Sequence, residues 1–354
     1  MTSVSHLTIG LDLGDNNSDV CVLDQQRREI ERRPVKTAPE SLKALFERYP
    51  GADVVFEVGS QSRWVQQLAK ESNMGTVIAA DPRQLKLISA SRSKNDRKDA
   101  YVLCRAAQGL PEMLHPVEHR SEEAHLHLQL LRSRDLLVQQ RTALVNRIRG
   151  MAKATGSKLP SGDAQYFFRK APEKLPEPLR KPCAPLFAIL AAIHEQLLLI
   201  TAQVRQLMKN YAAAQLLTTI PSVGDLTALT FVLTIDDPNR IRGARNIAAL
   251  LGITPRKKES GDSTPQLGIT KAGDSNMRRL LVLCAHHLLS RGKDCRLKQW
   301  GLQLCQRGGS NAKKRAVVAV ARKLAVHMLA IWKSGETYDP WRDVPAEMMP
   351  AQAS

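Results

Sequence analysis

Two short apolar runs near the amino terminus each contain one acidic residue, and this feature limits the fold most. Asp12 lies in the run at residues 7–14, and Glu57 lies near the end of the run at residues 52–59. Such runs are typical of buried strands, where a charge is costly unless it has a partner. We therefore expect each carboxylate to have a partner that compensates its charge.

The pattern of residues 7–80 predicts three strands, a helix, a strand, a helix and a strand. The turn-rich residues 15–18 indicate a β-hairpin between the first two strands. The strands are expected at residues 7–14, 19–24, 29–36, 52–59 and 76–80, and the helices at residues 39–49 and 61–71. This is the order of an α/β RNase H-like fold, in which the first and fourth strands are neighbours. Asp12 and Glu57 would then converge.

Residues 94–100, with the sequence KNDRKDA, supply two further acids just before a helix-like run. Asp96 and Asp99 are three residues apart and share a helical face. Neighbouring carboxylates repel, and a hard divalent cation with oxygen ligands relieves the repulsion. The alternative is a solvated helix start with acids in its first turn. Four cations that suit an anionic polymer surround these acids: Arg92, Lys94, Arg97 and Lys98.

The composition favours a nucleic-acid partner. The 354 residues carry a formal net charge of +18, and such a surplus favours binding to a polyphosphate. A ribosomal or histone-like binding protein would account for the charge equally well. The length allows two or three domains.

The cysteines and the apolar runs bear on the cellular compartment. The six cysteines have no CxxC pair or zinc-ligand spacing, which fits reduced thiols in a cytosol. No signal peptide is recognisable at the amino terminus, and the apolar run at residues 186–200 is interrupted by polar residues. We expect a soluble cytoplasmic protein.

Residues 120–212 predict long helices that carry regular apolar seams. One seam has Leu130, Leu137, Leu144 and Met151 at intervals of seven, as in a coiled coil. A second helix follows a basic, proline-rich interruption at residues 158–185. The two helices would pair within one chain or between two chains, and the pattern allows both. Five arginines of the first helix either contact a nucleic-acid backbone or form a solvated face: Arg132, Arg134, Arg141, Arg147 and Arg149.

Residues 216–229 predict a helix-hairpin-helix element, whose backbone amides suit a phosphate. Ser222 stands where such hairpins often have glycine. A polar, basic loop follows at residues 253–264 and contains Ser260. A serine needs a base or a metal to become a good nucleophile, so Ser260 alone reads as an ordinary loop residue. The candidate nucleic-acid contacts of this region are Arg256, Lys257, Lys258, Lys271, Arg278 and Arg279.

Taken together, these motifs resemble those of the DEDD transposases of the IS110 insertion-sequence family. The resemblance runs from the strand at Ile9, which carries Asp12, to about Trp332, and this family includes Piv-type DNA invertases and bridge-RNA-guided recombinases. Its motifs are VVFE at 54–57, NDRKDA at 95–100, IPSVG at 220–224, LLGITP at 250–255, the Ser260–Gly261 pair, ITKAG at 269–273 and MRRLL at 277–281.

The resemblance implies a domain organisation and a set of site residues. Residues 1–118 would form a RuvC-like domain whose metal ligands are Asp12, Glu57, Asp96 and Asp99, with one or two Mg²⁺ ions and Mn²⁺ as an alternative. Residues 119–212 would form a coiled-coil oligomerisation region. Residues 213–338 would form a transposase domain in which Ser260 becomes a phosphoserine, and residues 339–354 a tail.

The resemblance also implies partners and a reaction. A structured noncoding guide RNA would pair with double-stranded target and donor DNA, and a homo-oligomer, from a dimer to a tetramer on DNA, would exchange strands in the bacterial nucleoid. The chain departs from the family at residues 13–15 and at Ser222. Two alternatives remain open: a Holliday-junction nuclease that uses the quartet to activate water, and a non-catalytic nucleic-acid-binding protein.

Overall fold

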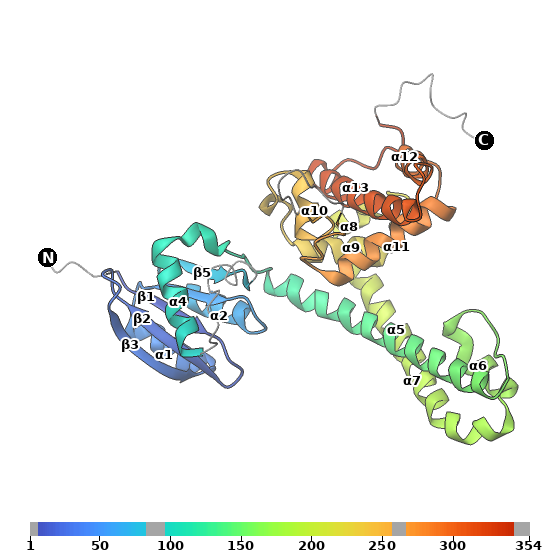
Figure 1. Cartoon of the computed structure of the whole chain (residues 1–354), viewed down its shortest axis with the longest axis horizontal. Helices are drawn as coiled ribbons and strands as arrows, with labels where there is room; N and C mark the ends of the chain where they lie inside the picture. Colours follow the sequence, from blue (N-terminus) through green and yellow to red (C-terminus); the bar gives the residue numbers. More distant parts are fainter. Residues whose placement is uncertain (1–5, 83–95, 257–266, 343–354) are drawn as a thin grey trace. The chain divides into compact units, whose positions relative to one another are not determined.

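The chain forms two compact units, Met1–His119 and Arg120–Ser354 (Figure 1). The structure, a computed structural model, describes residues 6–82, 96–256 and 267–342, and only the backbone of residues 96–98. Each unit is considered by itself below.

The first unit is built on a five-stranded mixed sheet, which confirms the predicted order of strands and helices. The strands are β1 (Thr8–Asp12), β2 (Asn17–Leu23), β3 (Glu29–Lys36), β4 (Asp53–Glu57) and β5 (Val77–Ala80). Their order in the sheet is β3-β2-β1-β4-β5. The β1–β2 and β2–β3 pairs are antiparallel, whereas β4 pairs in parallel with β1 and β5. The first and fourth strands are therefore neighbours, as expected.

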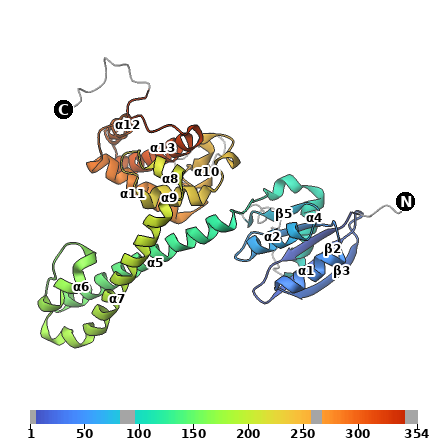
Figure 2. The same ribbon diagram turned by 180° about the vertical axis from the view of Figure 1, so that it is seen from behind.

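Helices cover both faces of this sheet (Figures 1 and 2). On one face, α1 (Pro39–Arg48) and α2 (Ser62–Glu71) bury Phe46 and Val65 against Ile9, Leu11 and other strand residues. On the other face, α4 (Asp96–Gly109) and the 3-10 helix η1 (Pro111–Leu114) pack against the alternate strand residues. The two apolar layers follow from the alternation of side chains along each strand.

A helical hairpin opens the second unit. Helix α5 (Glu122–Ala154) packs along α7 (Glu177–Met208) within the same chain, so of the two predicted pairings the structure has the intrachain one. The amino-terminal part of α5 packs against the carboxy-terminal part of α7, and the carboxy-terminal part of α5 packs against the amino-terminal part of α7. The pair is therefore antiparallel. Short helices fill the connection: η2 (Ala164–Tyr166), α6 (Phe167–Lys170) and η3 (Pro172–Lys174).

The predicted proline-rich interruption at residues 158–185 was too long. Helix α7 begins at Glu177 and contains Pro182 and Pro185. Proline removes a helical hydrogen bond, and the burial of Cys183 and Leu190 against α5 compensates for the loss. By length and composition α7 is also the one described helix apolar enough to cross a membrane, although a helix packed in a protein can pass the same test.

The rest of the second unit is a helical domain around one large core. Its helices are α8 (Ala212–Leu217), α9 (Asp225–Ile235), α10 (Ile247–Leu250), α11 (Ser275–Arg291), α12 (Arg296–Cys305) and α13 (Ala312–Ser334), with the 3-10 helices η4 (Pro238–Arg240) and η5 (Ala244–Asn246). All but the first two residues of α9 are buried, and Phe231 packs near Trp332 of α13. In the turn between α8 and α9, Ser222 has a φ of 70°, a conformation that usually favours glycine.

The junction between the units lies at a single peptide bond. The backbone amide of His119 donates to Gln66 Oε1 of the first unit at 3.4 Å. The next residue, Arg120, donates from Nε to the carbonyl oxygen of Thr234 in the second unit at 2.7 Å. Consecutive residues are thus bound to different units.

Candidate active site

Asp12 and Glu57 lie at adjacent ends of two parallel strands. In the β1–β4 ladder Leu11 is the partner of Phe56, and Asp12 and Glu57 are the next residue of each strand. Asp12 is half-buried and Glu57 is exposed. Parallel strands end at the same edge of a sheet, and this edge is where α/β folds commonly build their sites.

The loops that follow these two strands are bound to each other. Gln61, just before α2, donates from Nε2 to the carbonyl oxygens of Gly14 at 3.0 Å and Asp15 at 3.3 Å. The hydroxyl of Ser62 donates to the Gly59 carbonyl at 2.8 Å. These bonds fix the ends of β1 and β4 relative to each other.

Helix α4 lies on the sheet face that Asp12 shares with Gly10. A Cβ atom on Gly10 would lie 2.2 Å from the carbonyl oxygen of Ala100, so only glycine permits this approach. Further along α4, the Cys104 thiol donates to the Cys21 carbonyl at 3.2 Å, and Gln108 Nε2 donates to Thr8 Oγ1 at 3.1 Å. Helix α4 therefore runs antiparallel to β1.

This direction puts the amino-terminal turn of α4 toward the end of β1 that carries Asp12. Asp96 and Asp99 belong to that turn, and Asp99 is half-buried. The side chain of Asp96 lies outside the described part of the chain. Among the described side chains, no three His, Cys, Asp or Glu residues lie close enough together to hold a metal ion. The backbone nevertheless places the strand ends at Asp12 and Glu57 and the first turn of α4 at one end of the sheet, and carboxylate oxygens suit a hard divalent cation.

Sequence reasoning did not identify Gly10 or Cys104, although both position α4. A glycine inside an apolar strand is the available signal, because it marks a close backbone approach. The Cys104 thiol is buried, and its hydrogen bond with Cys21 together with burial raises its pKa above the ordinary value. Cys104 therefore serves as a neutral packing residue.

The segments that flank Ser260 form the stem of a small hairpin. Pro255 pairs with Ile269 in an antiparallel bridge. The amide of Arg256 donates to the Gly268 carbonyl, and the amide of Thr270 to the Thr254 carbonyl, each at 2.9 Å. Ser260 itself lies in the part of the chain that the structure does not describe, between the two sides of this stem.

Two glycines hold this stem against the end of α10. A Cβ atom on Gly273 would lie 2.0 Å from the Leu250 carbonyl oxygen, and one on Gly252 would lie 2.5 Å from the Ala272 amide nitrogen. Arg278 reinforces the contact, because its Nη1 donates to the Leu251 carbonyl at 2.9 Å.

The candidate nucleic-acid contacts fall into three groups. Arg256 and Lys271 are exposed on the stem. Arg278 binds the chain as above, and Arg279 forms an ion pair with Asp135 of α5. The others lie outside the described residues, either entirely or by their side chains: Arg92, Lys94, Arg97, Lys98, Lys257 and Lys258.

The strand order and helix placement of the first unit define the class, a protein with an RNase H-like domain. Comparison with known families then gives two matches. A model of IS110-type DEDD transposases matches residues 9–156, and one described as a transposase of the IS116/IS110/IS902 family matches residues 214–300. The chain is therefore a member of the IS110 family of DEDD transposases.

Individual relatives match along nearly the whole chain. The transposase for insertion sequence element IS1111A of Coxiella burnetii is 29% identical over 93% of this chain and 90% of its own length. The transposase for insertion sequence element IS1328 of Yersinia enterocolitica is 29% identical over 90% of this chain and 94% of its own. The pilin gene-inverting protein of Moraxella lacunata is 29% identical over 37% of this chain and 39% of its own.

Membership fixes the general activity. The protein is an insertion-sequence transposase, an enzyme that acts on DNA by cleavage and strand exchange, and its family implies dependence on a divalent metal.

Proposed function

We propose that this transposase cleaves and rejoins DNA with Asp12, Glu57, Asp96 and Asp99 as metal ligands and Ser260 as nucleophile. The observation that supports the proposal is the position of Asp12 and Glu57 at adjacent strand ends, on the sheet face that α4 covers. In the proposal, Asp96 and Asp99 at the start of α4 complete the ligand set. Four oxygen donors would hold one or two Mg²⁺ ions, with Mn²⁺ as a substitute. When bound, such a cation lowers the pKa of a coordinated hydroxyl and neutralises phosphate oxygens.

In the proposed reaction, Ser260 attacks a phosphodiester of the DNA. The Ser260 Oγ–phosphorus bond forms as the bond from phosphorus to the leaving deoxyribose oxygen breaks, and the hydroxyl proton is released while the leaving oxygen takes one up. One phosphate ester replaces another, so rejoining to a new strand needs no ATP. The glycine-locked stem at Gly252 and Gly273 would hold the Ser260 loop in a defined orientation.

Cations would hold the DNA backbone without reading its sequence. The exposed candidates are Arg256 and Lys271, and the net charge of +18 is consistent with extensive phosphate contact. The turn between α8 and α9 would act as a helix-hairpin-helix element. Specificity would come from a structured noncoding guide RNA paired with target and donor DNA, as in other guided systems.

The second unit would contain an oligomerisation region, residues 119–212, a transposase domain, residues 213–338, and a tail. In this proposal the α5–α7 hairpin joins protomers into a dimer, and two dimers form a tetramer on DNA. The enzyme would work at the chromosome, in the bacterial nucleoid.

Replacing the proposed nucleophile tests the central claim. Ser260→Ala should abolish both cleavage and the covalent protein–DNA adduct, whereas Ser263→Ala, in the same loop, should retain both. The reaction would contain the protein, the guide RNA, target and donor DNA and Mg²⁺, with the adduct resolved on denaturing gels. Continued cleavage by Ser260→Ala would instead favour a Holliday-junction nuclease that uses activated water.

A second pair of variants tests the acids. Asp12→Asn should remove the metal-dependent activity, and Glu47→Gln, at an exposed position of α1, should not. If Asp12→Asn changed nothing and cleavage required no divalent metal, a non-catalytic binding protein would be the better description. Omitting the RNA from the same reaction tests the guide, because exchange that proceeds without RNA would exclude it.

A further inference from the structure

The tip of the α5–α7 hairpin concentrates positive charge. Residues 147–181 contain nine Lys and Arg residues against three Asp and Glu residues, 9 − 3 = +6, which is a third of the net charge of the chain in a tenth of its length. Eight of these nine cations are exposed: Arg147, Lys153, Lys158, Arg169, Lys170, Lys174, Arg180 and Lys181. Neither the four proposed metal ligands nor Ser260 lies in this segment.

Few of these charges are neutralised by the protein itself. Arg180 pairs with Glu177 at 2.6 Å. Among the residues that the structure describes, none of the other seven exposed cations forms an ion pair with a carboxylate. A segment of this kind attracts a polyanion, because binding releases condensed counterions.

The tip also presents aromatic rings beside its cations. Tyr166 is 41% exposed. The Arg169 guanidinium lies 5.9 Å from the ring centroid of Tyr166 and 5.3 Å from that of Phe168. Aromatic rings among cations are what proteins use to stack unpaired bases next to a bound backbone.

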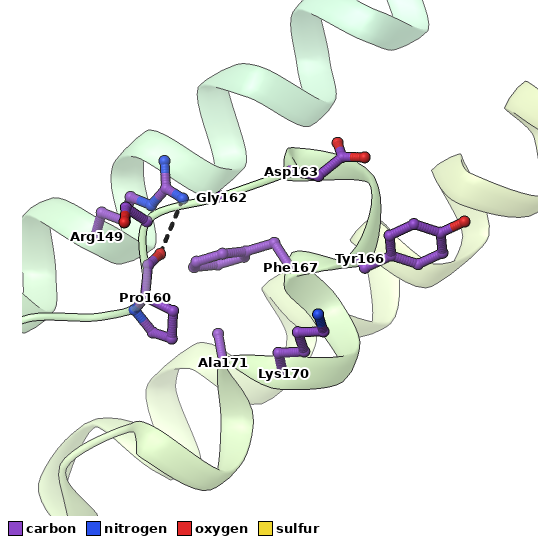
Figure 3. A pocket seen from close by; sticks show the side chains of 9 residues that line it. Arg149, Pro160, Gly162, Asp163, Tyr166, Phe167, Lys170 and Ala171 are labelled. Atoms are coloured by element: carbon purple, nitrogen blue, oxygen red, sulfur yellow. Dashed lines mark hydrogen bonds between the residues drawn. The ribbon is translucent and has the colours of Figure 1, made fainter.

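A small hollow lies beside these rings. Figure 3 shows Arg149, Gly162, Phe167 and Lys170 around it, with the ring of Tyr166 directed away from it. Arg149 is held in place, since its Nη2 donates to the Pro160 carbonyl at 3.1 Å and its guanidinium lies 5.0 Å from the Phe167 ring centroid. The hollow measures about 70 Å³, room for about two water molecules. It is too small for a base, so an unpaired base would stack on the exposed ring of Tyr166 instead.

We infer that the hairpin tip binds a single-stranded segment of nucleic acid, with an unpaired base on Tyr166 and phosphates beside Lys158, Lys170 and Lys174. A single strand is favoured over a duplex because the bases of a duplex are already stacked on one another and cannot cover an exposed ring. A DNA strand and an RNA strand share this chemistry. The proposed contacts include none of the four carboxylates and not Ser260, so the binding test needs no catalysis.

The first test measures the binding of short single-stranded DNA, single-stranded RNA and duplex DNA to the full-length protein without divalent metal. Tyr166→Leu keeps an apolar side chain near His194 and should weaken single-strand binding about 5- to 150-fold, the value of one stacked base. Duplex binding should change much less. Circular dichroism establishes that the variant is folded, and Tyr166→Phe, which keeps the ring, should bind nearly as wild type.

The second test removes charge. Lys158→Gln/Lys170→Gln/Lys174→Gln should make the salt dependence of single-strand binding shallower by about 2 in log–log slope, at about 0.7 per phosphate contact. The control Lys209→Gln/Lys313→Gln/Lys314→Gln removes three exposed lysines elsewhere in the second unit and should have a smaller effect. Equal effects of the two triple variants would overturn the proposal.

Photocrosslinking locates the contact. Strands that carry 5-iodouracil bases should crosslink to the tryptic peptide containing Tyr166. The crosslinking yields of the RNA strand and the DNA strand show which nucleic acid the tip prefers. Crosslinks found only outside residues 147–181, or tip variants that lose binding to phosphatidylserine vesicles but not to single strands, would refute the inference.

Discussion

Gly10 of β1 and Ala100 of α4 approach so closely that a Cβ atom on Gly10 would lie 2.2 Å from the Ala100 carbonyl oxygen. The contact joins the strand that carries Asp12 to the helix that carries Asp96 and Asp99. The geometry of the candidate active site therefore depends on a residue that has no side chain.

Gly10→Ala should destabilise the first unit and displace α4. The obstacle is backbone, which cannot rotate away as a side chain can, so we expect a loss of about 1–3 kcal/mol. Gly59→Ala is the matched control, because nothing lies within 4 Å of its added Cβ atom. Urea unfolding followed by circular dichroism measures both. A Gly10→Ala midpoint equal to that of Gly59→Ala would contradict the packing described here.

Gly273→Ala should disrupt the stem that carries the Ser260 loop. Gly273 has a φ of 132°, and its added Cβ atom would lie 2.0 Å from the Leu250 carbonyl oxygen. We expect a loss of about 1–3 kcal/mol and a larger loss of strand exchange. Gly268→Ala, on the same side of the stem, meets nothing within 4 Å and should retain both properties. Wild-type exchange by Gly273→Ala would show that the stem does not position the loop.

Glu31 makes the stability of the first unit depend on acid pH. Burial alone would raise the pKa of Glu31, but the hydrogen bonds from Tyr49 and Arg33 outweigh it and hold the pKa below the ordinary value of a glutamate. A lowered pKa in the folded state stabilises the protein above the pKa of the unfolded state, and this stability is lost as the pH falls through the folded value.

Glu31→Gln should therefore cost about 1–2 kcal/mol at pH 7 and much less at an acid pH below the lowered pKa of Glu31, where the wild-type carboxylate is also neutral. Urea titrations at both pH values check this. Glu40→Gln, at an exposed position of α1, controls for the general effect of removing one charge. An equal cost of Glu31→Gln at both pH values would mean that packing, and not charge, explains the loss.

Thiol reactivity should be confined to Cys305 in the native protein. Five of the six cysteines are buried, and Cys305 is half-buried. A neutral, buried thiol reacts slowly with disulfide reagents, so Ellman's reagent should label about one thiol rapidly and the rest on denaturation. Cys305→Ser should remove the rapid phase, and Cys104→Ser should leave it intact. Rapid labelling of two or more thiols would indicate that the buried cysteines become accessible.

Local sequence pattern predicted the sheet well and the contacts that assemble the site poorly. The strands β1 to β5 were predictable because apolar runs, turn residues and acids follow one another in a recognisable order. The contact of Gly10 with Ala100 joins distant parts of the chain, and a single sequence contains no signal for its partner. The start of α7 was misplaced because Pro182 and Pro185 normally end helices, and the packing that tolerates them is tertiary.

Among the candidate catalytic residues, too, local pattern was predictable and tertiary contacts were not. Asp12 and Glu57 could be matched through the strand order alone, since neighbouring parallel strands end at one edge. The stem on either side of the Ser260 segment could not be predicted in this way. Its two sides are short and polar, and their position depends on the contact of Gly273 with Leu250. Arg279, a predicted nucleic-acid contact, also forms an ion pair with Asp135 on another helix, and the sequence alone contains no signal for that pair.

The peptide bond between His119 and Arg120 is a natural point for exchanging modules between relatives. His119 hydrogen-bonds to the first unit and Arg120 to the second, so a chimaera spliced at this bond keeps each of these two hydrogen bonds within one unit. A splice moved by one residue would separate His119 from its acceptor Gln66, or Arg120 from its acceptor Thr234. Swapping the first 119 residues as a cassette would thus ask which module determines the choice of DNA.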